Sequence, residues 1–136
     1  MKSVRDQYYK NIEHIIVDGK SSDATLQIIN KNKASDTVLI SEPDTGIYNA
    51  LNKGIVRATG DVIGFLHSDD TFATETALVR IAENFDRLPC DAVYGDLNYV
   101  SSKDREKVVR RWRSGDLRIS QFKLGWMPPH PALFIR

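Results

Sequence analysis

The chain has 136 residues, of which 41% are hydrophobic and 27% are charged, and these proportions are ordinary for one globular domain covering residues 1–136. The formal net charge of +1 gives no overall attraction to nucleic acid, so we expect no nucleic-acid partner. The single cysteine, Cys90, excludes an intrachain disulfide. No apolar run approaches the roughly 20 residues that cross a bilayer, and the start does not resemble a signal peptide, so we expect a cytoplasmic location.

Strands and helices are predicted to alternate along the first hundred residues. The expected strands are 12–17, 38–40, 62–66 and 92–94, and the expected helices are 24–31, 47–58 and 74–88. This alternation favours an α/β fold with a mostly parallel sheet and helices packed on it. Beyond Val100 we expect an exposed strand at 107–113, a short helix at 116–122 and another strand at 132–135.

Acidic residues follow each of the four strands expected in the first hundred residues. The carboxyl ends of parallel strands share one edge of a sheet, which is where open α/β sheets bind ligands. Independent surface acids would not be expected to sort in this way. The residues concerned are Asp18, Glu42, Asp44, Asp69, Asp70 and Asp96.

The most informative stretch is Gly60–Asp70, in which an expected buried strand ends in His67, Ser68, Asp69 and Asp70. Two adjacent carboxylates at the end of a buried strand are costly unless a positive charge neutralises them. A divalent cation that also holds a phosphate would do so, which predicts a metal-dependent nucleotide or phosphate site. Alternatively, one of the two acids only caps the next helix.

The remaining candidates also have ordinary structural interpretations. Asp18 could form a turn with Gly19, the loop that holds Glu42 and Asp44 could be unremarkable, and His67 could be a polar residue at a strand end. His130 lies between two prolines, and we expect a structural role for it.

Three segments in order, Ile12–Gly19, Glu42–Gly54 and Ala58–Asp70, resemble the family 2 glycosyltransferases of the bacterial colanic-acid and polysaccharide type. The resemblance implies a GT-A fold, in which a Rossmann-like nucleotide-binding half is joined to an acceptor half. It also implies transfer of a sugar, with inversion, from a nucleotide-diphosphate sugar to a polysaccharide or other saccharide, or to a lipid-linked acceptor. Residues 1–100 would then form the nucleotide-sugar-binding part, and residues 101–136 the start of the acceptor part.

The resemblance also assigns roles to individual residues. Asp18 would contact the base or ribose, and Asp44, His67, Ser68 and Asp69 would complete the nucleotide-sugar site. Asp69 and Asp70 match the end of the family's Asp-x-Asp motif, so one of them would coordinate Mn²⁺ or Mg²⁺ bridged to the diphosphate. Such a cation would stabilise the charge on the leaving group.

The chain departs from the family pattern in three places. No segment corresponds to the family's opening strand, His67 stands where many relatives have Asp or Asn, and the usual catalytic base would lie beyond Arg136. We therefore expect an incomplete sheet without the first family strand, and weak or absent transferase activity from these residues alone. Open strand edges also suggest a homodimer.

A basic segment, Lys103–Arg118, is expected to be the solvated face of a hairpin or a contact with a lipid-diphosphate acceptor or an anionic membrane surface. In the membrane interpretation, Trp112 and Trp126 would be interfacial anchors. Three other functions stay open. They are a non-catalytic remnant that binds nucleotide or a partner, a Mg²⁺-dependent phosphoacceptor module, and a nucleotidyltransferase-like module.

Overall fold

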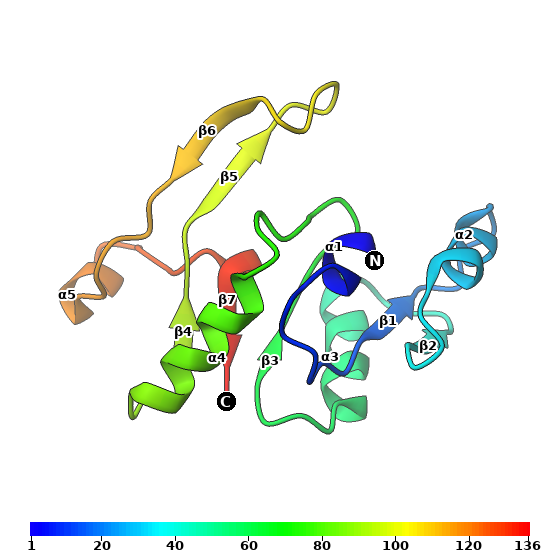
Figure 1. Ribbon diagram of the computed structural model, residues 1–136, viewed down its shortest axis with the longest axis horizontal. Coiled ribbons are helices and arrows are strands. Elements are labelled where there is room, and N and C mark those ends of the chain that lie inside the picture. The colour runs from blue at the N-terminus through cyan, green and yellow to red at the C-terminus, as the bar shows by residue number, and fades with distance from the viewer.

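The computed structural model describes all residues, 1–136, and confirms the alternation of strands and helices (Figure 1). Most predicted elements are present with ends shifted by a few residues. In chain order they are α1 Lys2–Arg5, β1 Ile15–Asp18, α2 Thr25–Asn32, β2 Val38–Ser41, α3 Ile47–Arg57, β3 Ile63–Gly64, α4 Ala77–Arg87, β4 Ala92–Tyr94, β5 Leu97–Val100, β6 Val108–Trp112, α5 Ile119–Phe122, a 3₁₀ turn His130–Ala132, and β7 Leu133–Ile135.

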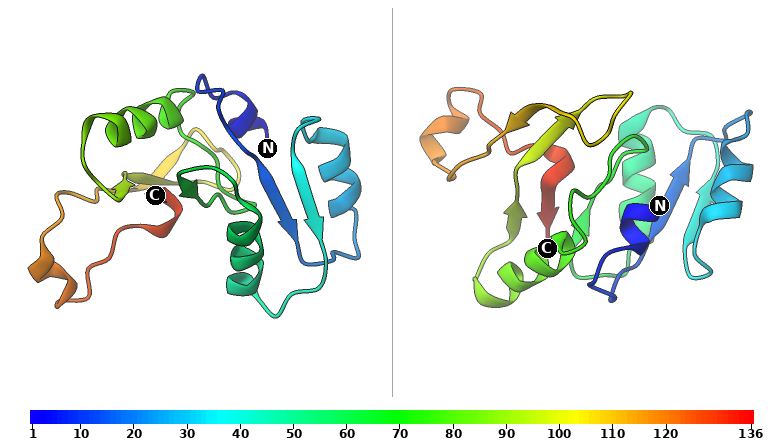
Figure 2. Two further views of the ribbon diagram at one scale, coloured as in Figure 1. Left: turned by 90° about the horizontal axis from the view of Figure 1, so that it is seen from below. Right: turned by 45° about the horizontal axis from the view of Figure 1, so that its top comes forward.

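The first layer is a parallel pair of strands, β1 and β2. Ile15 lies opposite Val38, and the register continues to Asp18 opposite Ser41, so both strands end at the same edge. Helix α3 follows this edge and packs against β1 (Figure 2). The helix begins after Gly46, whose φ of 122° favours glycine. It ends at Arg57, because the backbone becomes extended at Ala58.

A second, three-stranded sheet has the order β3-β7-β4, with β7 antiparallel to both neighbours. The expected α/β fold is confirmed with a small parallel sheet formed by β1 and β2, whereas the second sheet holds antiparallel pairs that the sequence analysis did not predict. Strands β3 and β4 do run in the same direction, but a strand from the far end of the chain lies between them. Apolar periodicity identifies strands without specifying their spatial order.

Strand β3 differs from the buried strand expected at 62–66. It is two residues long, with Ile63 half-buried and Gly64 exposed. Gly64 is needed here because a Cβ atom at this position would overlap the aromatic ring of Phe134 on β7. The contact places β7 directly against the strand that leads to His67.

The basic segment contributes β6 to the antiparallel hairpin β5–β6, which extends away from the rest of the molecule (Figure 1). The predicted strand at 107–113 is confirmed as β6, whereas its partner β5 was not predicted. Trp126, just beyond α5, stacks edge-to-face on Tyr94 at 5.9 Å and on Phe122 at 5.6 Å between ring centroids. These contacts hold α5 against the end of β4.

Few side chains are buried, and the most enclosed of them is polar. Gln7 is 1% exposed, and its amide donates to the carbonyl oxygens of Ser3 and Thr74 and accepts from the Leu78 N–H at 3.0 Å. It thereby fastens α1 to the start of α4. The buried residues are Val4, Gln7, Asp18, Ile29, Thr37, Phe85, Ser114 and Pro129.

The apolar side chains of α3 are largely exposed to solvent. Ile47 is 55% exposed and Ile55 is 43% exposed, because no other element covers that side of the helix. On the other two long helices, Ile29 of α2 and Phe85 of α4 are buried. No helix of the structure is both long enough and apolar enough to cross a membrane.

Candidate functional site

Asp18 closes the end of β1 and is the most elaborately bonded of the predicted site residues. It is 6% exposed, and its carboxylate accepts hydrogen bonds from the backbone N–H of Ser21 at 3.0 Å, from the Ser21 hydroxyl, and from the Ser41 hydroxyl at 2.7 Å. Hydrogen bonds from Ser21 and then Ser41 hold the pKa of Asp18 below its usual range. The ionised carboxylate therefore joins the ends of β1 and β2.

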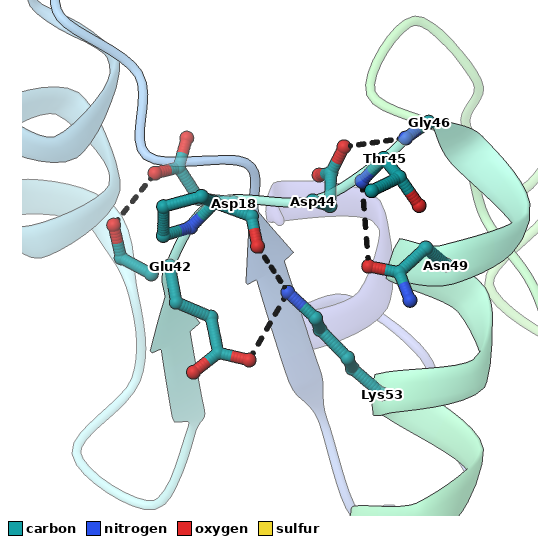
Figure 3. Close-up of polar contacts among 9 residues, drawn as sticks. Asp18, Glu42, Asp44, Thr45, Gly46, Asn49 and Lys53 are labelled. Carbon is teal, nitrogen blue, oxygen red and sulfur yellow. Dashed lines mark hydrogen bonds and ion pairs between the residues drawn. The ribbon is translucent and has the colours of Figure 1, made fainter.

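Asp44 lies beside this carboxylate, on the loop that follows β2 (Figure 3). Its Oδ1 accepts a hydrogen bond from the Gly46 N–H at 2.9 Å. Its carboxylate carbon would lie 3.3 Å from a Cβ atom placed on Gly19, so the absence of a side chain there lets the two loops approach. The loops that follow β1 and β2 therefore hold Asp18 and Asp44 at the same edge of this pair of strands.

A cation that the sequence analysis missed also lies at this edge. The Lys53 ammonium on α3 is 3.0 Å from the Glu42 carboxylate and donates a 2.6 Å hydrogen bond to the Pro43 carbonyl oxygen (Figure 3). It faces an open hollow of about 440 Å³ between β2 and α3, which Asn49, Asn52 and Arg57 also line. The spacing of Asn49 and Lys53, one turn apart on α3, was the signal that could have located this group.

The second group of predicted residues forms a tight turn at the end of β3. The backbone N–H of Asp70 donates to the His67 carbonyl oxygen at 3.1 Å. The side chains of Ser68 and Asp69 are exposed, and those of His67 and Asp70 are half-buried. No hydrogen bond or ion pair joins this turn to Asp18 or Asp44, so the structure does not merge the two groups into one bonded cluster.

His130, for which the sequence analysis predicted only a structural role, lies beside this turn. The imidazole of His130, which begins the turn leading to β7, lies edge-on to that of His67 with 5.4 Å between ring centroids and 66° between ring planes. Only the antiparallel insertion of β7 brings these two residues, 63 positions apart, into contact.

The predicted convergence of acids also included Asp96 and a metal ion. Asp96 accepts a 2.8 Å hydrogen bond from the Ser114 N–H, and its role is to fasten the base of the β5–β6 hairpin. No group of three or more His, Cys, Asp or Glu residues is arranged to hold a metal ion. Asp69 and Asp70 therefore provide two carboxylates without a protein-built cage around them.

Comparison with known proteins identifies the family and several relatives. The sequence profile of Glycosyl transferase family 2 matches residues 1–134. A PGL/p-HBAD biosynthesis glycosyltransferase of Mycobacterium bovis is 35% identical over 109 residues, covering 77% of this chain and 43% of the relative. An uncharacterized glycosyltransferase of Mycobacterium tuberculosis is 40% identical over 84 residues, covering 61% of this chain and 32% of the relative.

A third relative has a more specific name. The UDP-Glc:alpha-D-GlcNAc-diphosphoundecaprenol beta-1,3-glucosyltransferase WfaP of Escherichia coli is 36% identical over 106 residues, which cover 76% of this chain and 41% of WfaP. The matched region thus amounts to less than half the length of each of these relatives.

Proposed function

Because the chain belongs to glycosyl transferase family 2, we propose that it forms the donor-binding part of an enzyme that transfers a sugar from a nucleotide-diphosphate sugar. The transfer would proceed with inversion to a saccharide or lipid-linked acceptor. The observation that carries this proposal is the position of Asp18, Asp44 and the His67–Asp70 turn, which all follow the carboxyl ends of strands. The name of WfaP, with a UDP-sugar donor and a lipid diphosphate acceptor, supports the same class of reaction.

In this proposal Asp18 and Asp44 form the nucleoside end of the donor site. Asp18 is rigid because three hydrogen bonds fix its carboxylate, and Asp44 is held by the Gly46 N–H. Ionised oxygens at this edge are suitable acceptors for ribose hydroxyl groups or base N–H groups. His67, Ser68 and Asp69 would contact the other end of the donor.

Asp69 and Asp70 have the chemistry of a shared cation site. Mg²⁺ is usually held by one or two carboxylates together with waters and substrate phosphates, so an exposed and a half-buried carboxylate without a third protein ligand fit a cation that arrives with the donor. Mn²⁺ or Mg²⁺ at this position would stabilise negative charge on the departing diphosphate. The carboxylates of Asp69 and Asp70 would hold and orient this cation.

Residues 101–136 differ from the rest of the chain in charge, which supports their assignment to the acceptor side. They contain nine Lys and Arg and three Asp and Glu residues, whereas residues 1–100 contain ten and fifteen. Exposed apolar side chains of Ile119, Leu124 and Met127 accompany this positive charge. We propose a peripheral contact with an anionic membrane from its cytoplasmic side. Homodimerisation through open strand edges remains a prediction.

We propose aliphatic membrane anchors in addition to the two tryptophans expected from the sequence. The Trp126 ring packs against Tyr94 and Phe122. The Trp112 ring lies under the Arg110 guanidinium, with 5.9 Å from the Arg110 Cζ to the ring centroid. Ile119 is 79% exposed and Leu124 is 87% exposed, so these aliphatic residues are the side chains available to a lipid surface.

Calorimetric titration of UDP-, GDP- and dTDP-sugars, with and without Mn²⁺, tests the donor site. We expect metal-dependent binding that Asp69→Ala or Asp70→Ala removes, whereas Asp86→Ala, an exposed acid on α4, binds like the parent chain. Metal-independent binding would refute the cation role. Absence of binding for every donor would refute the donor function and favour a remnant that binds another partner.

A further inference from the structure

We propose that His130 is a donor-binding residue, and that it forms with His67 a histidine pair whose ring nitrogens contact the diphosphate of the donor. This inference rests on the proposed function, and it adds a residue from the C-terminal segment to the donor site. It begins from the edge-on contact of the two imidazoles, whose centroids are 5.4 Å apart.

The fold fixes His130 at this position from both sides. Pro129 is buried and Pro131 follows directly, so the backbone on each side of His130 has little freedom. Strand β7 then pairs with β3 through Phe134 opposite Gly64 and with β4 through Phe134 opposite Val93. Because β7 is held on both edges, His130 is set at the end of β3, where His67 lies.

Both imidazoles are available to a ligand. His130 is exposed and His67 half-buried, and no hydrogen bond within the protein engages the ring nitrogens of either residue. Imidazole N–H groups are effective donors to phosphate oxygens, and hydrogen bonds to ionised acceptors are stronger than neutral ones.

The segments that carry the two histidines contain no lysine or arginine near them. No lysine or arginine occurs between Arg57 and Arg80, or between Lys123 and Arg136. The turn at the end of β3 therefore presents two carboxylates to a negatively charged diphosphate with no cationic side chain from either segment. His67 and His130 bring imidazole N–H donors to this turn.

The test separates ligand contact from ring packing. His130→Phe keeps an aromatic edge against His67 but has no N–H, whereas His130→Gln keeps an N–H donor. We expect His130→Phe to weaken binding of UDP-glucose with Mn²⁺ by about tenfold or more, and His130→Gln to restore a substantial part of that loss. His14→Phe, at the amino end of β1, is the matched control and should bind normally. Urea unfolding of each variant checks that the fold persists.

A second measurement follows the rings directly. In ¹H–¹⁵N correlation spectra of the imidazoles, UDP-glucose or inorganic pyrophosphate should shift the ring signals of His130 and His67 and leave those of His14 unchanged. Normal binding by His130→Phe, with loss of binding in Asp69→Ala, would overturn the role of His130 while the donor site stands. If no sugar nucleotide binds, the donor proposal fails, and an unmoved His130 signal with pyrophosphate overturns the histidine pair as well.

Discussion

Gly64→Ala is a small change that should disturb the sheet connecting the two ends of the chain. The added Cβ would overlap the near edge of the Phe134 ring, and it would lie 2.9 Å from the ring carbon Cζ. Because the contact faces an aromatic ring on the neighbouring strand, either the ring or the strand must move. The substitution therefore tests whether β7 is seated against β3 as the structure describes.

The size of the effect follows from the two ways of relieving this overlap. If Phe134 stays in place, overpacking of this kind costs about 1–3 kcal/mol. If the ring swings outward, the half-buried phenylalanine loses part of the roughly 1.5–3 kcal/mol that burial of such a side chain contributes. Both routes predict that the free energy of unfolding falls by about 1–3 kcal/mol.

Urea unfolding in a double-mutant cycle with Phe134→Ala provides the assay. Once the ring is removed, Gly64→Ala should be neutral or stabilising by up to about 1 kcal/mol, because alanine restricts the unfolded chain. Gly60→Ala is the control, since its Cβ would meet no atom closer than the Val62 carbonyl oxygen at 3.9 Å. An equal cost of Gly64→Ala in both backgrounds would refute the contact.

Three further predictions test the Gln7 hydrogen bonds, the pH dependence of stability and the basic segment. Gln7→Ala leaves the Leu78 N–H and two carbonyl oxygens without their partner, and it should lower the free energy of unfolding by about 2–4 kcal/mol in urea; no loss would contradict the link between α1 and α4. The Thr59 backbone N–H lowers the pKa of Glu13, and Ser21 lowers that of Asp18, so both carboxylates contribute stability above their usual pKa that is lost as pH falls through the lowered values. The melting temperature should therefore fall between about pH 5 and pH 2, and Asp18→Asn, but not Asp86→Asn, should flatten that fall. Arg110→Glu with Arg111→Glu should remove sedimentation with phosphatidylserine vesicles at low salt, and unchanged sedimentation would reject the membrane contact.

The sequence predicted local features well because they depend on neighbouring residues. Helix α3 follows from Ile47, Leu51 and Ile55 at helical spacing, and β1 and β2 follow from short apolar runs. The location of Asp18 and Asp44 at one edge was also predictable, since consecutive parallel strands end at the same edge. Each of these inferences needed only chain order and the period of a regular element.

Features that depend on spatial order could not be predicted in this way. The insertion of β7 between β3 and β4 pairs Gly64 with Phe134, which are 70 positions apart, and no local pattern encodes that choice. The same insertion explains why His130 was interpreted only as a rigid residue between prolines. Strand β3 was expected to be buried because Val62–Leu66 is apolar, but it has too few neighbours in this sheet to be enclosed.

The position of β7 bears on how the expected donor and acceptor parts work together. Residues 133–135 lie in the segment that we propose for the acceptor side, yet they form the central strand of the sheet that carries the His67–Asp70 turn. The same segment is continuous with Trp126, whose stacking on Tyr94 holds α5 beside β4. A displacement of α5 would therefore be transmitted to β7 through residues 127–132, three of which are prolines. We therefore predict that substitutions between residues 126 and 135 alter donor binding at the proposed histidine pair, although Asp69 and Asp70 are unchanged.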